Sequence, residues 1–255
     1  MDSALVRGVP DSFIDALRGG SGPALDADLA REQHGVYVAL LESAGYAIEA
    51  VAADERHPDS VFVEDTAVVV GLTAVVARSG APTRRGETPP IAAALASRFS
   101  TTTIEPPGTL DGGDVMQIGG SVYVGRSRRT NRNGIDQLAA ICATLDIPVT
   151  TVDVHDALHL KSVVLPLDDE AVLTTPNSVD EQALKDLQIL YEAESEHRRC
   201  SALPMRDGRL MVTANAPATA DMLAKAGYSV VPIDVSELQA ADGGLTCLSI
   251  VFREP

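Results

Sequence analysis

One thiol near the end of the chain stands in a context that could serve chemistry. Cys247 follows the turn Asp242-Gly243-Gly244 and begins a short apolar stretch that runs to Phe252. A tight glycine turn can leave a thiol at the mouth of a pocket, where its thiolate would act as a nucleophile. Taken alone, however, a free cysteine is more often a small buried hydrophobe. Cys247 is therefore a candidate nucleophile only if other reactive side chains meet it.

Three further segments place charged or titratable residues beside apolar strand candidates. They are Asp-Ser-Val-Phe-Val-Glu-Asp at 59–65, Leu-Asp-Gly-Gly-Asp-Val at 110–115 and Leu-His-Leu-Lys-Ser-Val-Val at 158–164. Each alone has an ordinary explanation: a solvated strand end, a turn, and a core or edge histidine with satisfied hydrogen bonds. All three stand at the start of predicted hairpins in successive repeat units. If equivalent strand ends converge on one axis, these residues and the thiol would form a cation-binding nucleophilic site.

The elements that would hold these residues recur as a hairpin followed by a helix. The hairpins are predicted at 61–70 with 74–78, 114–118 with 121–124, 160–165 with 170–175, and 202–205 with 209–214. The helices that follow them are predicted at 89–99, 133–145, 179–190 and 217–226. Strands at 4–9 and 248–253 could pair as a fifth unit with a helix at 26–44, and a further strand is predicted at 47–51. A period of about 40 to 50 residues, repeated about five times, predicts a propeller or array.

Other folds and site types fit the glycine motifs poorly. Gly112-Gly113 and Gly119-Gly120 lie inside a hairpin unit, whereas a Rossmann sheet needs its glycines between a strand and a helix. The glycine-rich segment 18–23 lacks the Gly-Lys-Ser/Thr ending of a phosphate loop, so no nucleotide site is predicted there.

Composition limits the class of protein and its partners. The chain has 255 residues, of which 45% are hydrophobic and 22% charged, and no linker divides it, so we expect one domain over 1–255. A net charge of −16 argues against nucleic-acid and anionic-membrane partners and would attract cationic ligands. No signal peptide or membrane-spanning run is predicted, and Cys142, Cys200 and Cys247 form neither a disulfide framework nor a metal pattern. We therefore expect a cytoplasmic protein.

Taken together, the motifs resemble dimethylarginine dimethylaminohydrolase, a family of the guanidine-modifying (pentein) superfamily. In colinear order they are 59–65, Arg84-Arg85-Gly86-Glu87, 110–115, Gly125 to Asn131, His159-Leu160-Lys161 and Leu245-Thr246-Cys247. The resemblance covers nearly the whole chain and is weakest at 180–221. It implies a five-bladed α/β propeller (pentein) with pseudo-five-fold ββαβ-type repeats around an axial active site, in agreement with the repeat count.

The resemblance also implies roles for individual residues. Three would carry catalysis: Cys247 as nucleophile, His159 as general acid and base, and Asp111 as the carboxylate that holds the substrate guanidinium and orients the histidine. The others would bind the substrate: Asp65 and Glu64 at the guanidinium, Arg84 and Arg129 at the carboxylate, and Asp59 with the backbone carbonyls of Leu17 and Ala241 at the α-amino group. The loop from Gly19 to Pro23 would then be a lid.

The reaction so implied is hydrolysis of asymmetric dimethylarginine or monomethylarginine to citrulline plus dimethylamine or methylamine. Cys247 would attack the guanidinium carbon, His159 would protonate the leaving amine, and water activated by His159 would release citrulline from a covalent thiouronium. No metal or organic cofactor is required. The partner would be a small cationic amino acid, and the protein could be a homodimer.

The position of Lys161 bears on the substrate. Related deiminases and amidinotransferases carry His-x-Asp, in which the aspartate accepts hydrogen bonds from the far guanidinium nitrogens, whereas this chain has His159-Leu160-Lys161. A dimethylated nitrogen has no N–H to donate, so a carboxylate facing it would be buried without a partner. Lys161 therefore favours a methylated substrate, unless its side chain simply points to solvent.

Two alternatives remain open at this point. A hydrolase or deiminase of the same fold could act on free arginine, and a non-catalytic protein could bind arginine analogues. The set of Cys247, His159 and Asp111 argues against the second, since a pure binding protein gains nothing from a nucleophile. Agmatine is disfavoured as a substrate because it has no carboxylate for Arg84 and Arg129.

Overall fold

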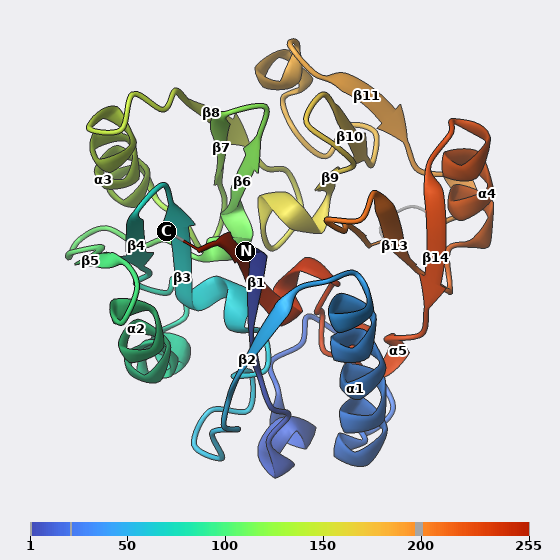
Figure 1. Cartoon of the computed structure of the whole chain (residues 1–255), viewed down its shortest axis with the longest axis horizontal. Helices are drawn as coiled ribbons and strands as arrows, with labels where there is room; N and C mark the ends of the chain where they lie inside the picture. Colours follow the sequence, from blue (N-terminus) through green and yellow to red (C-terminus); the bar gives the residue numbers. More distant parts are fainter. Residues whose placement is uncertain (1, 21, 197–200, 255) are drawn as a thin grey trace.

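Five small sheets, each of three strands, surround a common axis in the computed structural model (Figure 1). The structure describes residues 2–20, 22–196 and 201–254. In every sheet the first strand runs antiparallel to the middle strand, and the middle strand runs parallel to the third. We number these sheets as blades 1 to 5 in chain order. The expected five-bladed α/β propeller is confirmed.

The blades take their strands from successive parts of the chain, in the order first, middle and third strand. They are β15 (Ser249–Arg253), β1 (Asp2–Arg7) and β2 (Ala47–Val51) in blade 1; β3 (Ala67–Val70), β4 (Thr73–Val76) and β5 (Ser100–Thr103) in blade 2; β6 (Val115–Ile118), β7 (Ser121–Arg126) and β8 (Val149–Asp153) in blade 3; β9 (Val164–Pro166), β10 (Ala171–Thr174) and β11 (Gln188–Tyr191) in blade 4; and β12 (Ala202–Pro204), β13 (Arg209–Thr213) and β14 (Ser229–Ile233) in blade 5.

Helices connect middle strands to third strands on the outside of the ring. They are α1 (Ala27–Ser43), α2 (Thr88–Ala96), α3 (Arg132–Ala143) and α4 (Pro217–Lys225), and the short α5 (Ser236–Ala240) follows blade 5. Side chains cap two of them: Asp26 accepts from the first-turn amides of α1, and Asn131 accepts from Gly134 at the start of α3. Among the described residues, no helix is long and apolar enough to cross a membrane.

Blade 4 departs from the sequence-based prediction. The prediction of a helix at 179–190 is wrong, because the segment forms a 3-10 turn (Glu181–Leu184) and then β11. Its connection from middle to third strand is the shortest in the ring, and Val179 within it forms a bridge with Val154 of blade 3. The bridge at Val179 and the 3-10 turn take up this connection in place of a helix.

The apolar core is divided among the contacts between neighbouring blades. Five clusters of buried side chains each join two adjacent blades, so that the clusters together close the ring. Alternating residues of a middle strand serve both neighbours: Val122 and Val124 of β7 pack toward blade 2, whereas Tyr123 packs toward blade 4. Because both strand faces are used in this way, charged side chains can reach the axis only where the strands end.

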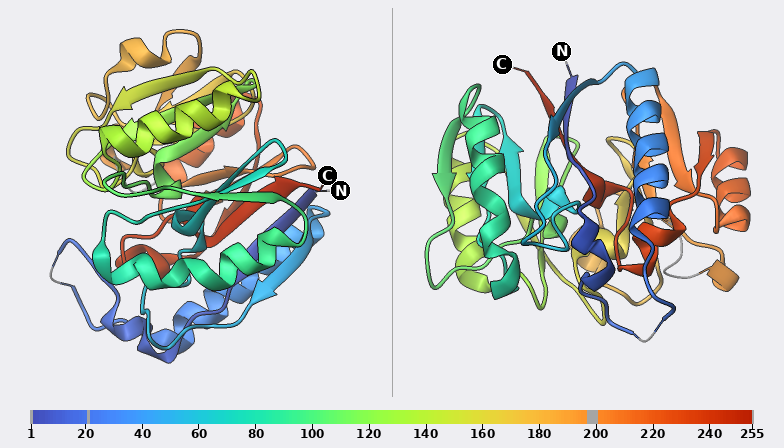
Figure 2. Two further views of the ribbon diagram at one scale, coloured as in Figure 1. Left: turned by 90° about the vertical axis from the view of Figure 1, so that its left-hand side faces the viewer. Right: turned by 90° about the horizontal axis from the view of Figure 1, so that it is seen from below.

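Blade 1 combines the two ends of the chain. β1 pairs antiparallel with β15, from Asp2 opposite Arg253 to Val6 opposite Ser249, which confirms the predicted pairing of the terminal strands. Figure 2 shows the two termini side by side at one end of the axis, with the chain just after β1 at the other end.

Candidate active site

Short 3-10 turns lead into the first strands of four blades. They are η2 (Val63–Thr66) before β3, η4 (Gly112–Asp114) before β6, η5 (Leu160–Ser162) before β9 and η8 (Thr246–Leu248) before β15. η2 contacts η8 and η4, and η4 contacts η5, so the turns meet at one end of the axis. Strands had been predicted through 61–66 and 160–162. A 3-10 turn spreads its side chains around its circumference, so polar residues here leave the apolar blade contacts and face the axis.

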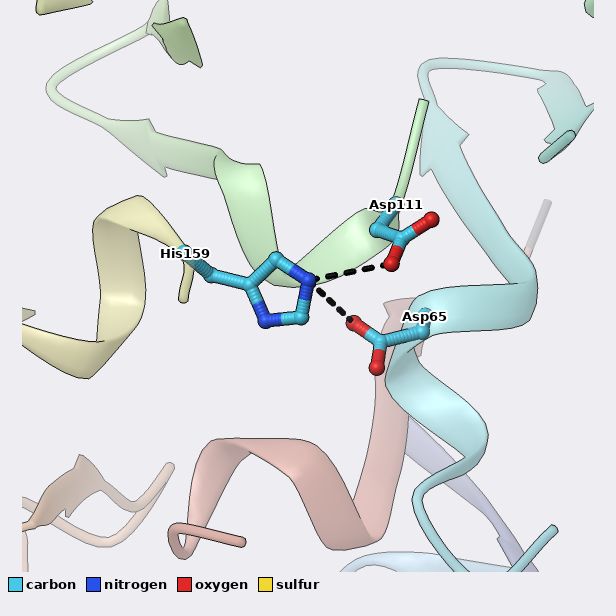
Figure 3. Close-up of side chains that lie close together, drawn as sticks. All are labelled: Asp65, Asp111 and His159. Atoms are coloured by element: carbon cyan, nitrogen blue, oxygen red, sulfur yellow. Dashed lines mark hydrogen bonds and ion pairs between the residues drawn. The ribbon is translucent and has the colours of Figure 1, made fainter. Parts of the chain in front are cut away.

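His159 meets two carboxylates from different blades (Figure 3). Its Nε2 lies 3.0 Å from Asp111 Oδ2 and 3.8 Å from Asp65 Oδ1, and all three residues are buried. Burial alone would lower the pKa of His159. The charge of Asp65, the hydrogen bond to Asp111 and the charge of Asp114 outweigh it and raise the pKa to about 9. The imidazole is therefore protonated at neutral pH.

Asp65 is in turn held by a buried arginine. Arg84 Nη1 pairs with Asp65 Oδ2, while Arg84 Nε and Nη2 donate to the carboxylate of Glu87 at 3.0 and 2.8 Å. Gly113 N–H donates to Asp65 Oδ1 at 3.0 Å. Burial would raise the pKa of Asp65, but the cations of His159 and Arg84 lower it to about 2. Asp65 is thus ionised at the pH at which His159 is charged.

The thiol of Cys247 lies on η8 and is partly exposed. Its Sγ accepts a hydrogen bond from Gly244 N–H at 3.3 Å. Burial and the negative charges of Glu64 and Asp65 raise the pKa of Cys247 to about 12, against the smaller opposing effects of Gly244 N–H and Lys161. Without an added cation the group is therefore a thiol rather than a thiolate.

Lys161 points into the protein and not to solvent. Its Nζ lies 2.5 Å from Glu64 Oε1, and each side chain is only 12% exposed. Burial raises the pKa of Glu64, and the charge of Lys161 acts in the opposite direction. The pair joins η5 to η2 beside Cys247, so the position where related deiminases carry a carboxylate here carries a paired cation.

A cavity of about 300 Å³ lies between these groups and the segment that follows η1 (Asp11–Asp15). Of the ten site residues expected from the sequence, eight line it: Leu17, Asp59, Asp65, Arg84, Arg129, His159, Ala241 and Cys247. The other two do not line it: Asp111 bonds to His159 behind the wall, and Glu64 pairs with Lys161, which lines a neighbouring pocket that shares Cys247. The structure therefore brings the whole expected set to one place.

The two arginines of the cavity differ in their free donors. Arg84 is 5% exposed, and its nitrogens donate to Asp65, Glu87 and the carbonyls of Phe62 and Asp59. Arg129 Nη1 lies 3.6 Å from Asp111 Oδ2 and, within the described part of the chain, makes no hydrogen bond. Arg129 thus keeps a donor for a ligand, whereas Arg84 is engaged by the protein.

A further carboxylate, that of Asp59, lines the cavity. Asp59 Oδ1 accepts from Leu17 N–H at 3.1 Å, and burial raises the pKa of Asp59. Gly19 N–H donates to Asp242 Oδ2 at 2.5 Å, which places the segment before Gly20 over the cavity. Ser21 lies outside the described residues, and the lid stays a prediction.

Asp65, Asp111 and His159 also offer ligand atoms within 4.8 Å of one another, a spacing that a metal ion would accept. Their atoms have other partners, however. Asp65 is bound by Arg84 and Gly113, and Asp111 accepts from Gly80 N–H at 3.0 Å and from His159. A neighbouring guanidinium and a histidine with a raised pKa favour a hydrogen-bonded cluster over a metal site.

Sequence reasoning gave no role to Glu87 or Asp114, although both stand in quoted motifs. Glu87 follows Arg84 at a spacing of three, which is the spacing of a side-chain pair on one helical turn. Asp114 is completely buried beside His159. Cys200 and His197, to which the sequence assigned no role, lie outside the described residues.

Comparison with known proteins identifies the family. The arginine deiminase family model matches residues 55–201. A Pseudomonas aeruginosa protein named N(G),N(G)-dimethylarginine dimethylaminohydrolase is 34% identical over 94% of this chain and 95% of its own. A Streptomyces coelicolor protein of the same name is 39% identical over 90% of this chain and 88% of its own. The chain belongs to the dimethylarginine dimethylaminohydrolase family.

Solved structures agree with this family assignment. The Pseudomonas aeruginosa enzyme, as a cysteine-to-serine mutant complexed with citrulline, superposes with a TM-score of 0.90 at 31% identity over 98% of both chains. A histidine-to-glycine variant of a dimethylarginine dimethylaminohydrolase, as an adduct with S-methyl-L-thiocitrulline, gives 0.92 at 31% identity over 99% of this chain and 100% of its own. The N-terminal domain of a cyanobacterial arginine dihydrolase gives 0.88 at 20% identity, which shows the shared fold alone.

Proposed function

We propose that the chain hydrolyses Nω-methylated arginines to citrulline and a methylamine, through a covalent intermediate on Cys247. The observation that carries the proposal is the cavity itself, which is lined by a thiol, a charged histidine, an aspartate and two arginines. Family members of the same name and the relative complexed with citrulline support this reaction. We also propose that residues 1–255 act as one catalytic domain.

The charges of the cavity suit a substrate that is cationic at one end and zwitterionic at the other. The guanidinium would meet Asp65 in the cavity wall by a charge-assisted hydrogen bond, and the carboxylates of Asp111 and Glu64 behind the wall would add negative charge. The substrate carboxylate would pair with the free donor of Arg129, and with Arg84 if that side chain exchanges a protein acceptor for it. The α-amino group would meet Asp59 and the backbone carbonyls of Leu17 and Ala241.

Activation of the thiol would depend on the substrate. Because the pKa of Cys247 is raised to about 12 chiefly by burial and by anions, a bound guanidinium cation would lower it by balancing those charges. His159 is already protonated, so the thiol proton leaves to solvent when the substrate binds. The thiolate then forms an S–C bond to the guanidinium carbon and gives a tetrahedral adduct.

His159 would act first as an acid and then as a base. It donates its proton to the methylated nitrogen, the C–N bond breaks, and the methylamine leaves a thiouronium on Cys247. Neutral His159 then removes a proton from water as the oxygen adds to the same carbon. Breakage of the C–S bond, with loss of the remaining hydroxyl proton to solvent, returns the thiolate and gives the ureido group of citrulline. Asp111 would hold the imidazole in place through both steps.

The ion pair of Lys161 with Glu64 supports a methylated substrate. A dimethylated nitrogen has no hydrogen to offer, and a paired cation at this place leaves no carboxylate without a donor. The match to the arginine deiminase family model keeps free arginine as the second candidate substrate. The cytoplasmic location and a homodimer stay predictions.

The decisive experiment is a substrate panel with the purified protein. Arginine, monomethylarginine, both dimethylarginines and agmatine are incubated separately, and citrulline and the released amine are measured. We expect the asymmetric methylated arginines to react and arginine to react little. Best turnover of free arginine would contradict the role given to Lys161.

A cysteine pair tests the mechanism in the same assay. We expect Cys247→Ser to abolish turnover while citrulline still binds, and the buried, free Cys142 provides the control as Cys142→Ala. Citrulline formation by Cys247→Ser at the wild-type rate would refute the covalent route.

A further inference from the structure

One buried carboxylate beside the cavity has no part in the proposed reaction. Asp114, the last residue of η4, is 0% exposed. Burial raises its pKa to about 6, against the charge of His159, hydrogen bonds from the Ser127 and Thr130 hydroxyls, and the Leu160 N–H. A buried carboxylate lowers the stability of the folded protein unless its oxygens accept hydrogen bonds or pair with a charge.

One oxygen of Asp114 holds the segment that carries His159. Oδ1 accepts from the backbone N–H of Leu160, the residue after His159, at 2.8 Å. Gly125 of β7 leaves room for this approach, because a Cβ there would lie 2.6 Å from Asp114 Oδ1 and 2.8 Å from Leu160 Cβ. η5 therefore rests on η4 through this carboxylate.

The other oxygen holds the loop that carries Arg129. Ser127 Oγ donates to Asp114 Oδ2 at 2.6 Å, and the same Oγ accepts from the backbone N–H groups of Arg129 at 3.0 Å and Thr130 at 3.2 Å. The hydroxyl has one hydrogen, and that hydrogen is directed at Asp114. The backbone around Arg129 is thus folded about a hydroxyl that Asp114 orients.

We propose that Asp114 is a positioning residue that couples the acid–base histidine His159 to the carboxylate-binding Arg129 across the active site. The proposal rests on the proposed function, which assigns those two roles. Two segments from different blades converge on one carboxylate, and a shift of either oxygen would move one of the two functional side chains relative to the other.

A neutral isostere cannot hold both segments. An amide has a single acceptor oxygen, and the N–H of Leu160 cannot turn away, whereas the Ser127 hydroxyl can rotate. In Asp114→Asn the amide oxygen should stay with Leu160, and the NH2 group then faces Ser127 Oγ, which already accepts two N–H groups. We therefore expect the loop that carries Arg129 to lose its hydrogen bond to residue 114.

The charge of Asp114 also acts on His159. Several titratable and charged groups surround the imidazole. They are Asp65 on η2 with Arg84 behind it, Asp114 on η4, Asp111 just before η4 with Arg129 near it, Cys247 on η8, and the Lys161–Glu64 pair. Removal of one of the three nearby carboxylate charges leaves the hydrogen bond to Asp111 in place and lowers the pKa of His159.

Two variants separate the hydrogen bond from the charge. For Asp114→Asn we expect KM for methylarginine to rise about tenfold, the effect of one or two lost hydrogen bonds, and His159 to titrate at lower pH than in the wild type. Ser127→Ala keeps the charge, so it should raise KM to a similar extent and leave the His159 titration unchanged. Asp168→Asn, far from the cavity, should change neither quantity.

The measurements are steady-state kinetics and an NMR titration of carbon-13-labelled histidine, with the His159 signal identified by its loss in His159→Gln. Asp114→Asn with wild-type KM and wild-type His159 titration would overturn the proposal. If Asp114→Asn does not fold, Ser127→Ala decides, and an unchanged KM overturns it.

The titration needs no turnover, so failure of the proposed function is recognised separately. If the proposed function is wrong, the wild-type protein will be inactive on every arginine in the panel. The His159 titration of Asp114→Asn can still be measured in that case.

Discussion

The same five blades end very differently at the two ends of their axis. At one end, the 3-10 turns η2, η4, η5 and η8 gather buried acids, a charged histidine and a thiol. At the other end, the hairpins turn through residues such as Gly71, Gly119 and Gly208, all of which have positive φ. The turns at Gly71 and Gly208 border an open hollow of about 980 Å³, and Arg209 in its lining forms a partly exposed ion pair with Asp207.

This difference shows where the fold can accommodate chemistry. A hairpin turn is specified by residues that tolerate left-handed backbone, and its polar groups are satisfied locally. The 3-10 turns are not closed on themselves, so each depends on side chains from the neighbouring blade. The polar groups of the 3-10 turns can therefore be combined into a site. The hairpin turns connect the strands of each blade and contribute no residue to that site.

Of the substitutions considered, replacement of His159 should have the largest effect on kcat relative to a control outside the site. We expect His159→Gln to lower kcat by about 10²- to 10⁴-fold, the usual contribution of a general acid–base group. The exposed His155 is the matched control, and His155→Gln should leave kcat unchanged. Citrulline formation at saturating substrate measures both. Retention of most of the activity by His159→Gln would remove the histidine from the reaction.

Ion pairs at the two ends should differ in their effect on stability. Lys161→Met leaves Glu64 buried without its cation and should lower the free energy of unfolding by about 3 kcal/mol. Arg209→Met breaks a pair in which each side chain is 31% exposed, and should cost less than about 1 kcal/mol. Urea denaturation measures both changes. Equal losses would mean that the Lys161 pair is screened like a surface pair.

Two arginines offer a test of ligand binding. Arg129→Ala removes a cavity-lining side chain with an unused donor, and KM for methylarginine should rise about 10- to 100-fold, as for a lost hydrogen bond to a charged group. Arg206, which pairs with Asp2 at 3.3 Å beside the hairpin turns, should give an unchanged KM when replaced by alanine. The ratio of the two KM values decides whether the free donor of Arg129 serves the substrate.

The pH dependence of stability should also follow the site. The folded pKa of His159, about 9, lies above its value of 6.5 in the unfolded chain. Its contribution is therefore fully present below pH 6.5 and is lost as pH rises through 9, at up to about 1.4 kcal/mol per pH unit. At the hairpin end, the pKa of Tyr228 is raised to about 12 and that of Asp168 is lowered, so neither titrates in this range.

The comparison of unfolding free energies between wild type and His159→Gln from pH 6 to pH 9.5 isolates this term. A difference that stays constant over the range would show that His159 has the same pKa in the folded and the unfolded protein.

Much of the fold could be predicted because its signals are local. Hairpins are marked by turn residues such as Asp207-Gly208, and α1, α3 and α4 begin and end close to the predicted bounds. Of the third strands in the described structure, β2 was predicted at its observed bounds, whereas β5, β8, β11 and β14 were not. β5 is Ser-Thr-Thr-Thr, with no apolar alternation to mark it, because it lies at the outer edge of its blade and is mostly exposed.

The site could be predicted as a set of residues but not as a set of contacts. Its members come from the motifs that carry the family resemblance, and eight of the ten line one cavity. Which partner each residue has depends on neighbours in the ring, such as Glu64 for Lys161, 97 positions away. Local sequence gives no sign of such pairs, nor of the difference between the engaged Arg84 and the free donor of Arg129.

The pairing of β1 with β15 has a consequence for how activity appears during folding. Cys247 lies just before β15, so the thiol reaches the axis only when a strand from late in the chain joins one from its beginning. Contacts between such distant segments form slowly in folding. Blades 2 to 4 can thus present their acids and histidine while the nucleophile is still unplaced. Placement of the thiol therefore depends on the pairing of β1 with β15, and a chain that has not made this pairing lacks the assembled site.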